Sequence, residues 1–489
     1  LLQGENQITV VIDGSENPEI SPFGGQIDYL TYAGIYRNVW LKTTDGLRIK
    51  NVQAIAEDVL HDEKALAVRV YLDQVVPGNY DGELVARLTT VDGRLVAEHH
   101  HVMSDYQGRD DFRMTGLTNI RLWDVDEPVL YRLEVSISGN SFNHQFSTRV
   151  GFRQARFTPD GFLLNGRRLK IRGINRHQSY PYMGYAMGAH AQKADADFIK
   201  TTLKFNLVRT SHYPQSPAFL DRCDELGLLV FEEIPGWQHI GGEEWKQGAI
   251  ANVDAMIQRD WNHPSIVLWG VRINESRDDD HFYERTNKLA HSLDPSRQTG
   301  GVRCHTGSSL LEDVYTMNDF VLNGGAVALR DQQQVTGLDH KVPYLVTEYN
   351  GHMFPTKRFD AEERQHEHVI RHLRVLDASY ADPNISGCIA WCLFDYNTHK
   401  DFGSGDRICY HGVSDMFRIP KFAAYAYKSQ CDVSDEQVMQ PVTFWARGER
   451  CECLILPLII LTNCDEIEFK FGDYPVKRLK PAVKQFPHL

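Results

Sequence analysis

Two glutamates stand out because each comes directly after a strongly apolar run. Glu275 follows a run that begins Ile-Val-Leu-Trp at 266–269, and Glu348 ends the run Tyr-Leu-Val-Thr-Glu at 344–348. If both runs are parallel strands of one barrel, the two carboxyl groups reach the same mouth from nearly opposite sides. A pair of carboxyl groups, one protonated and one ionised, can cleave a glycosidic bond. The pair therefore predicts glycoside hydrolysis.

Other polar residues end further apolar runs and should meet at the same mouth. They are Asn175, Arg176, His177, Arg209, Ser211, His212, Tyr213, Glu232, Glu233, Asn274, Tyr315, Asn318, Trp391 and Asp395. Glu232 and Glu233 are alternative catalytic carboxylates, but we favour one of them as a buried partner for His or Arg. We interpret Trp391 as a platform for a sugar ring rather than as plain core.

The elements that must position these residues alternate between apolar strands and helix-like segments. Eight strands are expected at 169–173, 207–210, 228–232, 266–273, 300–303, 314–317, 344–348 and 385–393. Helices are expected at 194–204, 217–226, 249–262, 282–292 and 361–380, with Gly227 as a C-cap. This order predicts a (β/α)8 TIM barrel over residues 154–430. The alternative, a doubly wound sheet, would need a glycine-rich phosphate loop, which residues 173–177 do not form.

The regions flanking the barrel have the short alternating runs of β-sandwiches. Residues 45–153 have room for roughly seven strands, which is typical of an immunoglobulin-like sandwich. Residues 1–44, with runs at 8–12 and 35–41, look like the last strands of a further domain. Residues 431–489, with runs at 442–446, 453–461 and 467–471, look like the opening strands of another sandwich. We therefore expect a multidomain chain with two complete and two partial domains, part of a longer protein.

Composition argues against several classes of partner. The chain has 489 residues, with 52 Lys and Arg against 65 Asp and Glu, a net charge of −13. Such an acidic chain has no summed field to attract nucleic acid or an anionic membrane. The longest apolar run, 454–461, is far too short to span a bilayer. The nine cysteines lack a repeated CxxC spacing, and no signal peptide is visible, so we expect a cytoplasmic protein.

Several segments, in order, resemble glycoside hydrolase family 2, which includes β-galactosidases, β-glucuronidases and β-mannosidases. They are Arg-Gly-Ile-Asn-Arg-His at 172–177, Asn-Leu-Val-Arg-Thr-Ser-His-Tyr-Pro at 206–214, residues 221–227, residues 262–275 and Val-Thr-Glu-Tyr at 346–349. Residues 34–37 are similar to the end of the family's sugar-binding jelly roll, and 151–153 to the exit from its immunoglobulin-like domain. The resemblance covers nearly the whole chain, and it implies that residues 1–44 are a partial jelly roll.

The resemblance implies a retaining mechanism in which Glu275 is the general acid/base and Glu348 the nucleophile. Asn274 would hydrogen-bond the sugar 2-hydroxyl, a contact that strengthens in the transition state. Arg209 would lie beneath Glu348 and hold it ionised. Tyr315 would lie close to Glu348.

The remaining implied contacts are with the sugar itself. His177 and His212 would bind its hydroxyls, and Trp391 would form the floor beneath its ring. Asp28 matches an aspartate that the jelly roll projects into the site of β-galactosidases. The carbohydrate substrate is the expected partner, and a homo-oligomer remains open.

Two departures from the family bear on cofactor and substrate. The family's β-galactosidases bind magnesium through a glutamate and a histidine after the third strand, but here Trp237 stands where the glutamate would be, and only His239 remains. We therefore expect no required cofactor, neither Mg nor Na. The Asn-x-Lys element by which β-glucuronidases bind a uronate is missing from 401–407, although Arg407 could bind a carboxylate. The acid/base segment is also longer than usual at 271–273, which suggests a bulge.

We therefore expect an exo-β-glycosidase acting on terminal β-D-galactosides by double displacement. The alternatives are a β-glucuronidase or β-galacturonidase of the same family, or a catalytically silent carbohydrate-binding fragment. A metal-dependent amide hydrolase on a barrel is a third hypothesis, and it lacks an early His-x-His on the first strand. His368 and His372 share one helix face, which we interpret as solvated rather than metal-binding, and residues 278–280 as an acidic helix start.

Overall fold

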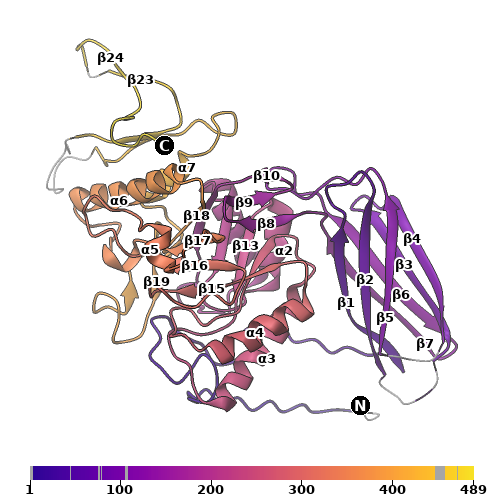
Figure 1. The fold of residues 1–489 in the computed structure, drawn as a ribbon. Coiled ribbons are helices and arrows are strands. Elements are labelled where there is room, and N and C mark those ends of the chain that lie inside the picture. Colours follow the sequence, from indigo (N-terminus) through magenta and orange to yellow (C-terminus); the bar gives the residue numbers. More distant parts are fainter. Residues whose placement is uncertain are drawn as a thin grey trace.

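The computed structural model describes residues 4–44, 46–74, 78, 80–104, 108–445, 457–470 and 472–489. Figure 1 shows an antiparallel sandwich beside a barrel, with small sheets near the C-terminal end and an extended N-terminal segment below α3. Residues 446, 453–456 and 471 of the runs expected at 442–446, 453–461 and 467–471 lie outside the described residues. Within the described residues, every helix is too short or too polar to cross a bilayer.

The sandwich consists of two antiparallel sheets whose alternating apolar side chains meet between them. One sheet has the order β1 (Leu47–Glu57), β2 (Lys64–Gln74), β5 (Arg109–Leu117). The other has the order β4 (Leu95–Met103), β3 (Gly82–Thr90), β6 (Tyr131–Gly139), β7 (Phe142–Val150). Leu84, Ala86 and Leu88 are fully buried at every second position of β3, as expected for a strand with one face on a core.

Eight parallel strands close into a barrel, as the sequence predicted. They are β11 (Ile171–Asn175), β12 (Leu207–Thr210), β13 (Leu229–Glu233), β14 (Ile266–Gly270), β15 (Gln298–Arg303), β16 (Val314–Asn318), β17 (Tyr344–Glu348) and β18 (Ile385–Ala390). Both β12 and β17 have the predicted bounds. The fourth strand ends at Gly270, three residues early, so residues 271–273 belong to the loop before Asn274.

Helices pack around the barrel and shield its outer face. They are α1 (Ala189–Asp197), which continues as a π-helical turn at Phe198–Thr202, α2 (Pro217–Leu226), α3 (Glu243–Asp260), α4 (Asp280–Leu293), α5 (Gln332–Thr336), a 3-10 turn at Gly351–Met353, α6 (Glu362–Ala381) and α7 (Phe422–Lys428). Gly227 ends α2 with a φ of 68°, which confirms the predicted C-cap. Asp279 caps α4 by accepting a hydrogen bond from the backbone N–H of Phe282 at 3.1 Å, which confirms the acidic helix start.

Short antiparallel pieces complete the fold. They are β8 (Ala155–Thr158), β9 (Gly161–Leu164) and β10 (Arg167–Arg168) before the barrel, and β19 (Tyr396–Asn397), β20 (Ile408–Cys409), β21 (Met439–Pro441), β22 (Ile460–Thr462), β23 (Ile467–Phe469) and β24 (Lys477–Leu479) after it. The described residues 4–44 contain no strand, so the strands expected at 8–12 and 35–41 are wrong. A strand needs a partner for its backbone groups, and no described segment pairs with these runs.

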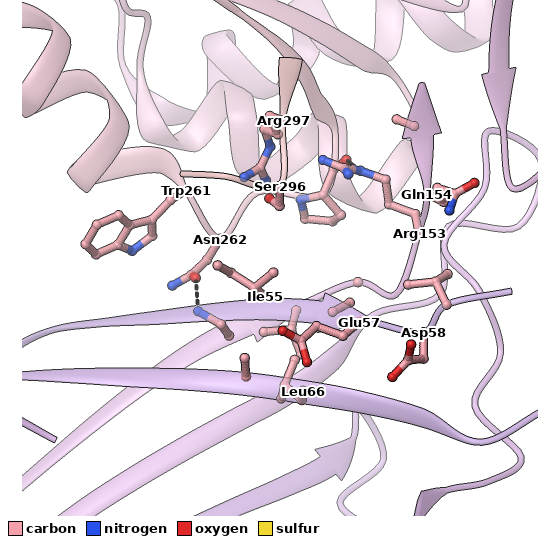
Figure 2. A pocket seen from close by; sticks show the side chains of 18 of the residues that line it. Ile55, Glu57, Asp58, Leu66, Arg153, Gln154, Trp261, Asn262, Ser296 and Arg297 are labelled. Carbon is pink, nitrogen blue, oxygen red and sulfur yellow. Dashed lines mark hydrogen bonds between the residues drawn. The ribbon is translucent and has the colours of Figure 1, made fainter. Parts of the chain in front are cut away.

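The sandwich is fixed to the barrel through its first strand. The backbone N–H of Ala54 donates to Asn262 Oδ1 at 2.9 Å, and Trp261 Nε1 donates to the Val52 carbonyl at 2.9 Å. A cavity of about 560 Å³ lies beside this junction, with Ile55 of β1 on one side and Trp261 on the other (Figure 2). These contacts connect the sandwich to the segment that precedes β14.

Candidate active site

The carboxyl ends of the barrel strands bring the predicted polar residues together. Arg209 is on β12, Glu233 ends β13, Asn274 and Glu275 follow β14, and Glu348 ends β17. Glu348 is only 4% exposed, whereas Glu275 is half-buried. One carboxyl is therefore enclosed by the barrel and the other lies toward its opening.

Arg209 is the centre of the hydrogen-bond network in this mouth. Its guanidinium is fully buried and donates from Nη1 to Glu348 Oε1 at 2.6 Å and to Asn175 Oδ1 at 2.9 Å. Nε and Nη2 donate to the two carboxylate oxygens of Glu233 at 3.0 and 2.8 Å. Nη2 also donates to Asn274 Oδ1 at 2.8 Å. A single side chain thus fixes groups from four strands or strand ends.

Opposing effects act on the Glu348 carboxyl. Burial raises its pKa well above the usual range, and the nearby charge of Glu275 acts in the same direction. The Arg209 guanidinium opposes the rise by pairing with the ionised form. Removal of this one cation would leave a buried carboxyl with a strong preference for its protonated form.

Glu275 is held at the end of a loop that enters the mouth with an unusual backbone. Its φ is 55°, and its backbone N–H donates to the Val302 carbonyl at 3.0 Å. Oε1 accepts from Asn318 Nδ2 at 3.0 Å, and Oε2 accepts from Gln238 Nε2 at 3.1 Å. Both carboxylate oxygens therefore have an amide donor.

The long spacing before Glu275 also has a structural reason. The loop buries Arg272 completely, where its Nε donates to Glu312 Oε1 at 3.1 Å. The same guanidinium donates to Asp278 Oδ1 at 2.7 Å and lies 4.3 Å from the Tyr283 ring centroid. These contacts anchor the loop behind the candidate acid/base residue.

Asn274 connects the two glutamates. Its Oδ1 accepts from Arg209, which binds Glu348, and lies 3.4 Å from Asn318 Nδ2, which binds Glu275. Its Nδ2 is buried and has no hydrogen-bond partner within the described part of the chain. A buried donor without a partner is costly, so this atom is suited to a substrate hydroxyl.

Two buried histidines form one wall of the mouth. His212 Nδ1 lies 2.8 Å from Glu233 Oε1, and its Nε2 lies 4.0 Å from Glu348 Oε1. His177 Nδ1 lies 3.0 Å from the Tyr213 hydroxyl, and its Nε2 has no partner among the described residues. Burial lowers the pKa of both imidazoles well below the usual range, so both are neutral.

Trp391 and Asp28 complete the mouth from opposite ends of the sequence. The Trp391 ring stacks on His212 with centroids 5.2 Å apart and an interplanar angle of 8°. Asp28 Oδ2 accepts from the Tyr396 hydroxyl at 2.9 Å, and Oδ1 is buried without a partner among the described residues. Burial raises the pKa of Asp28 to about 7, and the charge of Glu275 adds to the rise.

Tyr315 does not lie close to Glu348, so its predicted position is wrong. Side chains alternate along β16, where Val314 points to the barrel interior and Tyr315 to the helix layer. The Tyr315 hydroxyl donates to the Val335 carbonyl of α5 at 3.5 Å. Asn318, three residues later, is the residue that pairs with Glu348 in the β16–β17 register.

Other candidates are also placed by the structure. Glu233 binds Arg209 and His212, which confirms the interpretation of a buried partner in the mouth.

His368 and His372 are 3% and 0% exposed, so the prediction of a solvated face is wrong. Helix α7 covers that side of α6, and the Tyr427 hydroxyl contacts His372 Nδ1. Their Nε2 atoms lie 3.2 Å apart.

A cavity of about 570 Å³ opens beside Glu275. Its walls include Trp237 and Phe402, whose rings meet edge to face at 5.9 Å, together with Gln238 and Cys304. The cavity borders Glu275 but not the enclosed Glu348. It leaves room for a chemical group or water on the side of the candidate acid/base residue.

Sequence reasoning missed several residues of this mouth. Gln238, Tyr396 and His411 lie in loops or short pieces after strands, where neither spacing nor periodicity singles out a residue. His411 Nδ1 accepts from Trp391 Nε1 at 3.3 Å.

Comparison with known proteins agrees with this architecture. Residues 156–434 match the family description "Glycosyl hydrolases family 2, TIM barrel domain", and residues 47–153 match "Glycosyl hydrolases family 2". The chain is 57% identical over 470 residues to a β-galactosidase of Thermoanaerobacterium thermosulfurigenes and 50% identical over 511 residues to one of Rhizobium meliloti. These alignments cover 96% and 100% of this chain but 66% of each relative, so the chain spans just under two thirds of their length.

Solved structures share the fold. A Bacteroides uniformis β-glucuronidase matches with a TM-score of 0.82 at 23% identity, covering 97% of this chain and 62% of that one. A β-galacturonidase from Eisenbergiella tayi matches with a TM-score of 0.74 at 26% identity, covering 85% of this chain and 77% of that one. With the family match over more than half of its residues, the chain belongs to glycosyl hydrolase family 2.

Proposed function

We propose that this chain carries the catalytic centre of a retaining exo-β-glycosidase that acts on terminal β-D-galactosides. The observation that carries the proposal is the pair of glutamates at one barrel mouth, joined through Arg209, Asn274 and Asn318. The β-galactosidase names of the two relatives at 57% and 50% identity support the choice of sugar.

In the first step, Glu348 attacks the anomeric carbon while Glu275 gives its proton to the leaving oxygen. The leaving group departs as an alcohol, and a covalent glycosyl–enzyme remains. In the second step, Glu275 takes a proton from water, and the resulting oxygen nucleophile displaces Glu348. Glu348 suits the nucleophile because it is enclosed and paired with a cation, whereas Glu275 borders the open cavity.

Three buried polar atoms without partners in the described residues support a sugar pocket. They are Asn274 Nδ2, His177 Nε2 and Asp28 Oδ1. Two of them belong to neutral side chains, and the third belongs to an aspartate. Above its pKa of about 7, the ionised Asp28 would repel the carboxylate of a uronide, which favours a neutral hexoside. The Arg407 side chain is exposed to solvent, so it does not offset this preference.

The family's magnesium site does not fit the residues of this chain. Trp237 supplies no oxygen ligand, and one oxygen of Glu275 already accepts from Gln238. The His239 ring packs against the N-terminal segment, where a Cβ on Gly24 or Gly25 would overlap it. We therefore propose that catalysis involves no metal at this position.

We assign the flanking domains on the same basis. We propose that the sandwich of β1 to β7 is immunoglobulin-like and that residues 4–44 belong to a jelly roll, which brings Asp28 to the mouth. Residues 431–489 would belong to a further sandwich. The family match at 47–153 supports the first of these assignments.

The proposed function is tested by Glu348→Gln, measured against a panel of aryl β-glycosides. The wild-type chain should hydrolyse the galactoside in preference to the glucuronide, galacturonide and mannoside. The variant should lose activity by about 10³-fold or more because the amide is a poor nucleophile. Glu244→Gln, an exposed change on α3, is the matched control and should keep full activity.

Near-normal turnover by Glu348→Gln would contradict the proposal. If the wild-type chain prefers the glucuronide or the galacturonide, the proposed substrate changes from a galactoside to a uronide. Galactose binding without hydrolysis of any glycoside by the wild-type chain would indicate a silent carbohydrate-binding protein instead.

A further inference from the structure

The loop after β13 is tied to the backbone next to Glu275. Trp237 forms a parallel bridge with Asn274, and the backbone N–H of Gln238 donates to the Asn274 carbonyl at 2.7 Å. Gln238 adopts a left-handed backbone with a φ of 59°, a conformation that costs free energy for a residue with a side chain. The surrounding contacts hold this conformation, which directs the Gln238 amide toward Glu275.

The two carboxyl groups of the mouth receive donors of different charge. Glu348 receives a cationic donor, Arg209 Nη1, at 2.6 Å. Glu275 receives two neutral donors, Gln238 Nε2 at 3.1 Å on Oε2 and Asn318 Nδ2 at 3.0 Å on Oε1. Asn318 approaches from inside the barrel, and the exposed Gln238 approaches from the cavity side.

This difference matches the two tasks in the proposed mechanism. A cationic donor strongly favours the ionised carboxylate, which suits a nucleophile. An acid/base residue has to be protonated in one step and ionised in the next. Neutral amides fix its orientation without a full charge, and each carboxyl oxygen keeps a second lone pair for the proton.

We propose that Gln238 is a positioning residue for the general acid/base Glu275. This inference rests on the proposed function. Gln238 transfers no proton itself. In the first step, the proton moves from Glu275 to the leaving oxygen, and the Gln238 N–H stabilises the carboxylate that forms. The contribution is therefore greatest when the leaving group needs that proton.

The geometry separates this role from a structural one. Gln238 is exposed, and within the described residues its side chain makes one recorded hydrogen bond, the one to Glu275. Loss of its amide should therefore leave the fold intact. The chain also offers a matched control in Gln247, an exposed residue on α3 whose Nε2 donates to Glu243 Oε1 at 2.7 Å.

The experiment compares Gln238→Met and Gln247→Met on two substrates. Phenyl β-galactoside has a poor leaving group that needs acid assistance, and 2,4-dinitrophenyl β-galactoside has a good one that does not. For Gln238→Met we expect kcat/KM to fall about 10-fold with the phenyl substrate and less than about 2-fold with the dinitrophenyl substrate. Gln247→Met should match the wild type on both. A chelator should leave all of these values unchanged, and added Mg²⁺ should not raise them.

Gln238→Glu provides a second variant of nearly the same shape. It replaces the amide donor with a carboxyl group. With the phenyl substrate, it should therefore lower kcat/KM at least as strongly as Gln238→Met does. Circular dichroism and thermal melting should agree with those of the wild type for both variants.

If kcat/KM of Gln238→Met falls equally with both substrates, or falls with neither, the inference is wrong and the proposed function still stands. Loss of wild-type activity in chelator with recovery on Mg²⁺ would overturn it as well. If the wild type hydrolyses neither substrate, the proposed function is wrong and the inference fails with it.

Discussion

The Arg209 guanidinium contacts Glu348 from inside the barrel, with Nη1 2.6 Å from Oε1, and both side chains are almost completely buried. A buried ion pair of this kind is costly to break, because removal of one partner leaves the other charge without compensation. The pair therefore connects the stability of the barrel to the protonation of its candidate nucleophile.

Arg209→Met should lower both the stability of the barrel and the ionisation of Glu348. Loss of the opposing cation raises the pKa of Glu348 further, so the ionised nucleophile becomes scarce and kcat should fall by about 10²-fold or more. The free energy of unfolding should fall by about 3 to 5 kcal/mol. Urea titration and steady-state kinetics measure the two effects. Arg87→Met, which breaks the exposed pair with Glu98, is the control and should cost less than about 1 kcal/mol.

Glu275→Ala should be rescued by azide. The variant lacks the base that activates water, so deglycosylation becomes slow, but azide attacks the glycosyl–enzyme without a base. With 2,4-dinitrophenyl β-galactoside, azide should raise the rate and yield the β-azide, which thin-layer chromatography detects. Formation of the α-azide, or no rescue, would count against Glu275 as the acid/base of a retaining enzyme.

Tyr315→Phe should leave catalysis unchanged. The Tyr315 hydroxyl contacts the Val335 carbonyl on the outer side of the barrel, away from the mouth. We expect kcat/KM within about 2-fold of the wild type and a loss of stability of about 1 kcal/mol or less. A tenfold fall in kcat/KM without unfolding would mean that Tyr315 reaches the substrate after all.

The stability of the folded chain should depend on Asp28 in a defined pH window. Its pKa is raised from 3.8 to about 7 in the fold, so between these values the folded state keeps a proton that the unfolded state releases. Its contribution is complete at low pH and is lost as the pH rises toward 7, with a slope of at most about 1.4 kcal/mol per pH unit.

Asp28→Asn cannot titrate, so it removes this slope. Urea unfolding at pH 4.5 and pH 7.5 should show the variant gaining stability relative to the wild type at the higher pH. If the free energies of unfolding of the variant and the wild type differ by the same amount at both pH values, the raised pKa of Asp28 is contradicted.

The barrel was predictable from the sequence because its strands are short apolar runs that end in polar residues. Residues 207–210 and 344–348 agree at both ends with β12 and β17. Their last residues were recognisable as mouth residues because the carboxyl ends of barrel strands meet at one face. Arg209, Asn274 and Glu348 lie in contact with one another or with shared partners for this reason.

The direction of individual side chains was harder to predict. All five residues of β16 are buried, so no polar alternation shows that Val314 points inward and Tyr315 outward. His368 and His372 look like a polar helix face, but α7, more than forty residues later in the chain, covers them. Gln238 is an exposed loop residue whose role depends on backbone bonds to Asn274, which no local pattern encodes.

The contact between Asp28 and Tyr396 joins residues 368 positions apart in the sequence. Thr398 also donates to the Asp28 backbone carbonyl, so the early segment is held by chain that follows the last barrel strand. During synthesis, Asp28 leaves the ribosome long before its partners exist. Closing so long a loop is entropically costly, and such contacts form late in folding. Nascent chains should therefore acquire a closed barrel before Asp28 reaches the mouth, and the proposed sugar pocket would be the last part of the site to form.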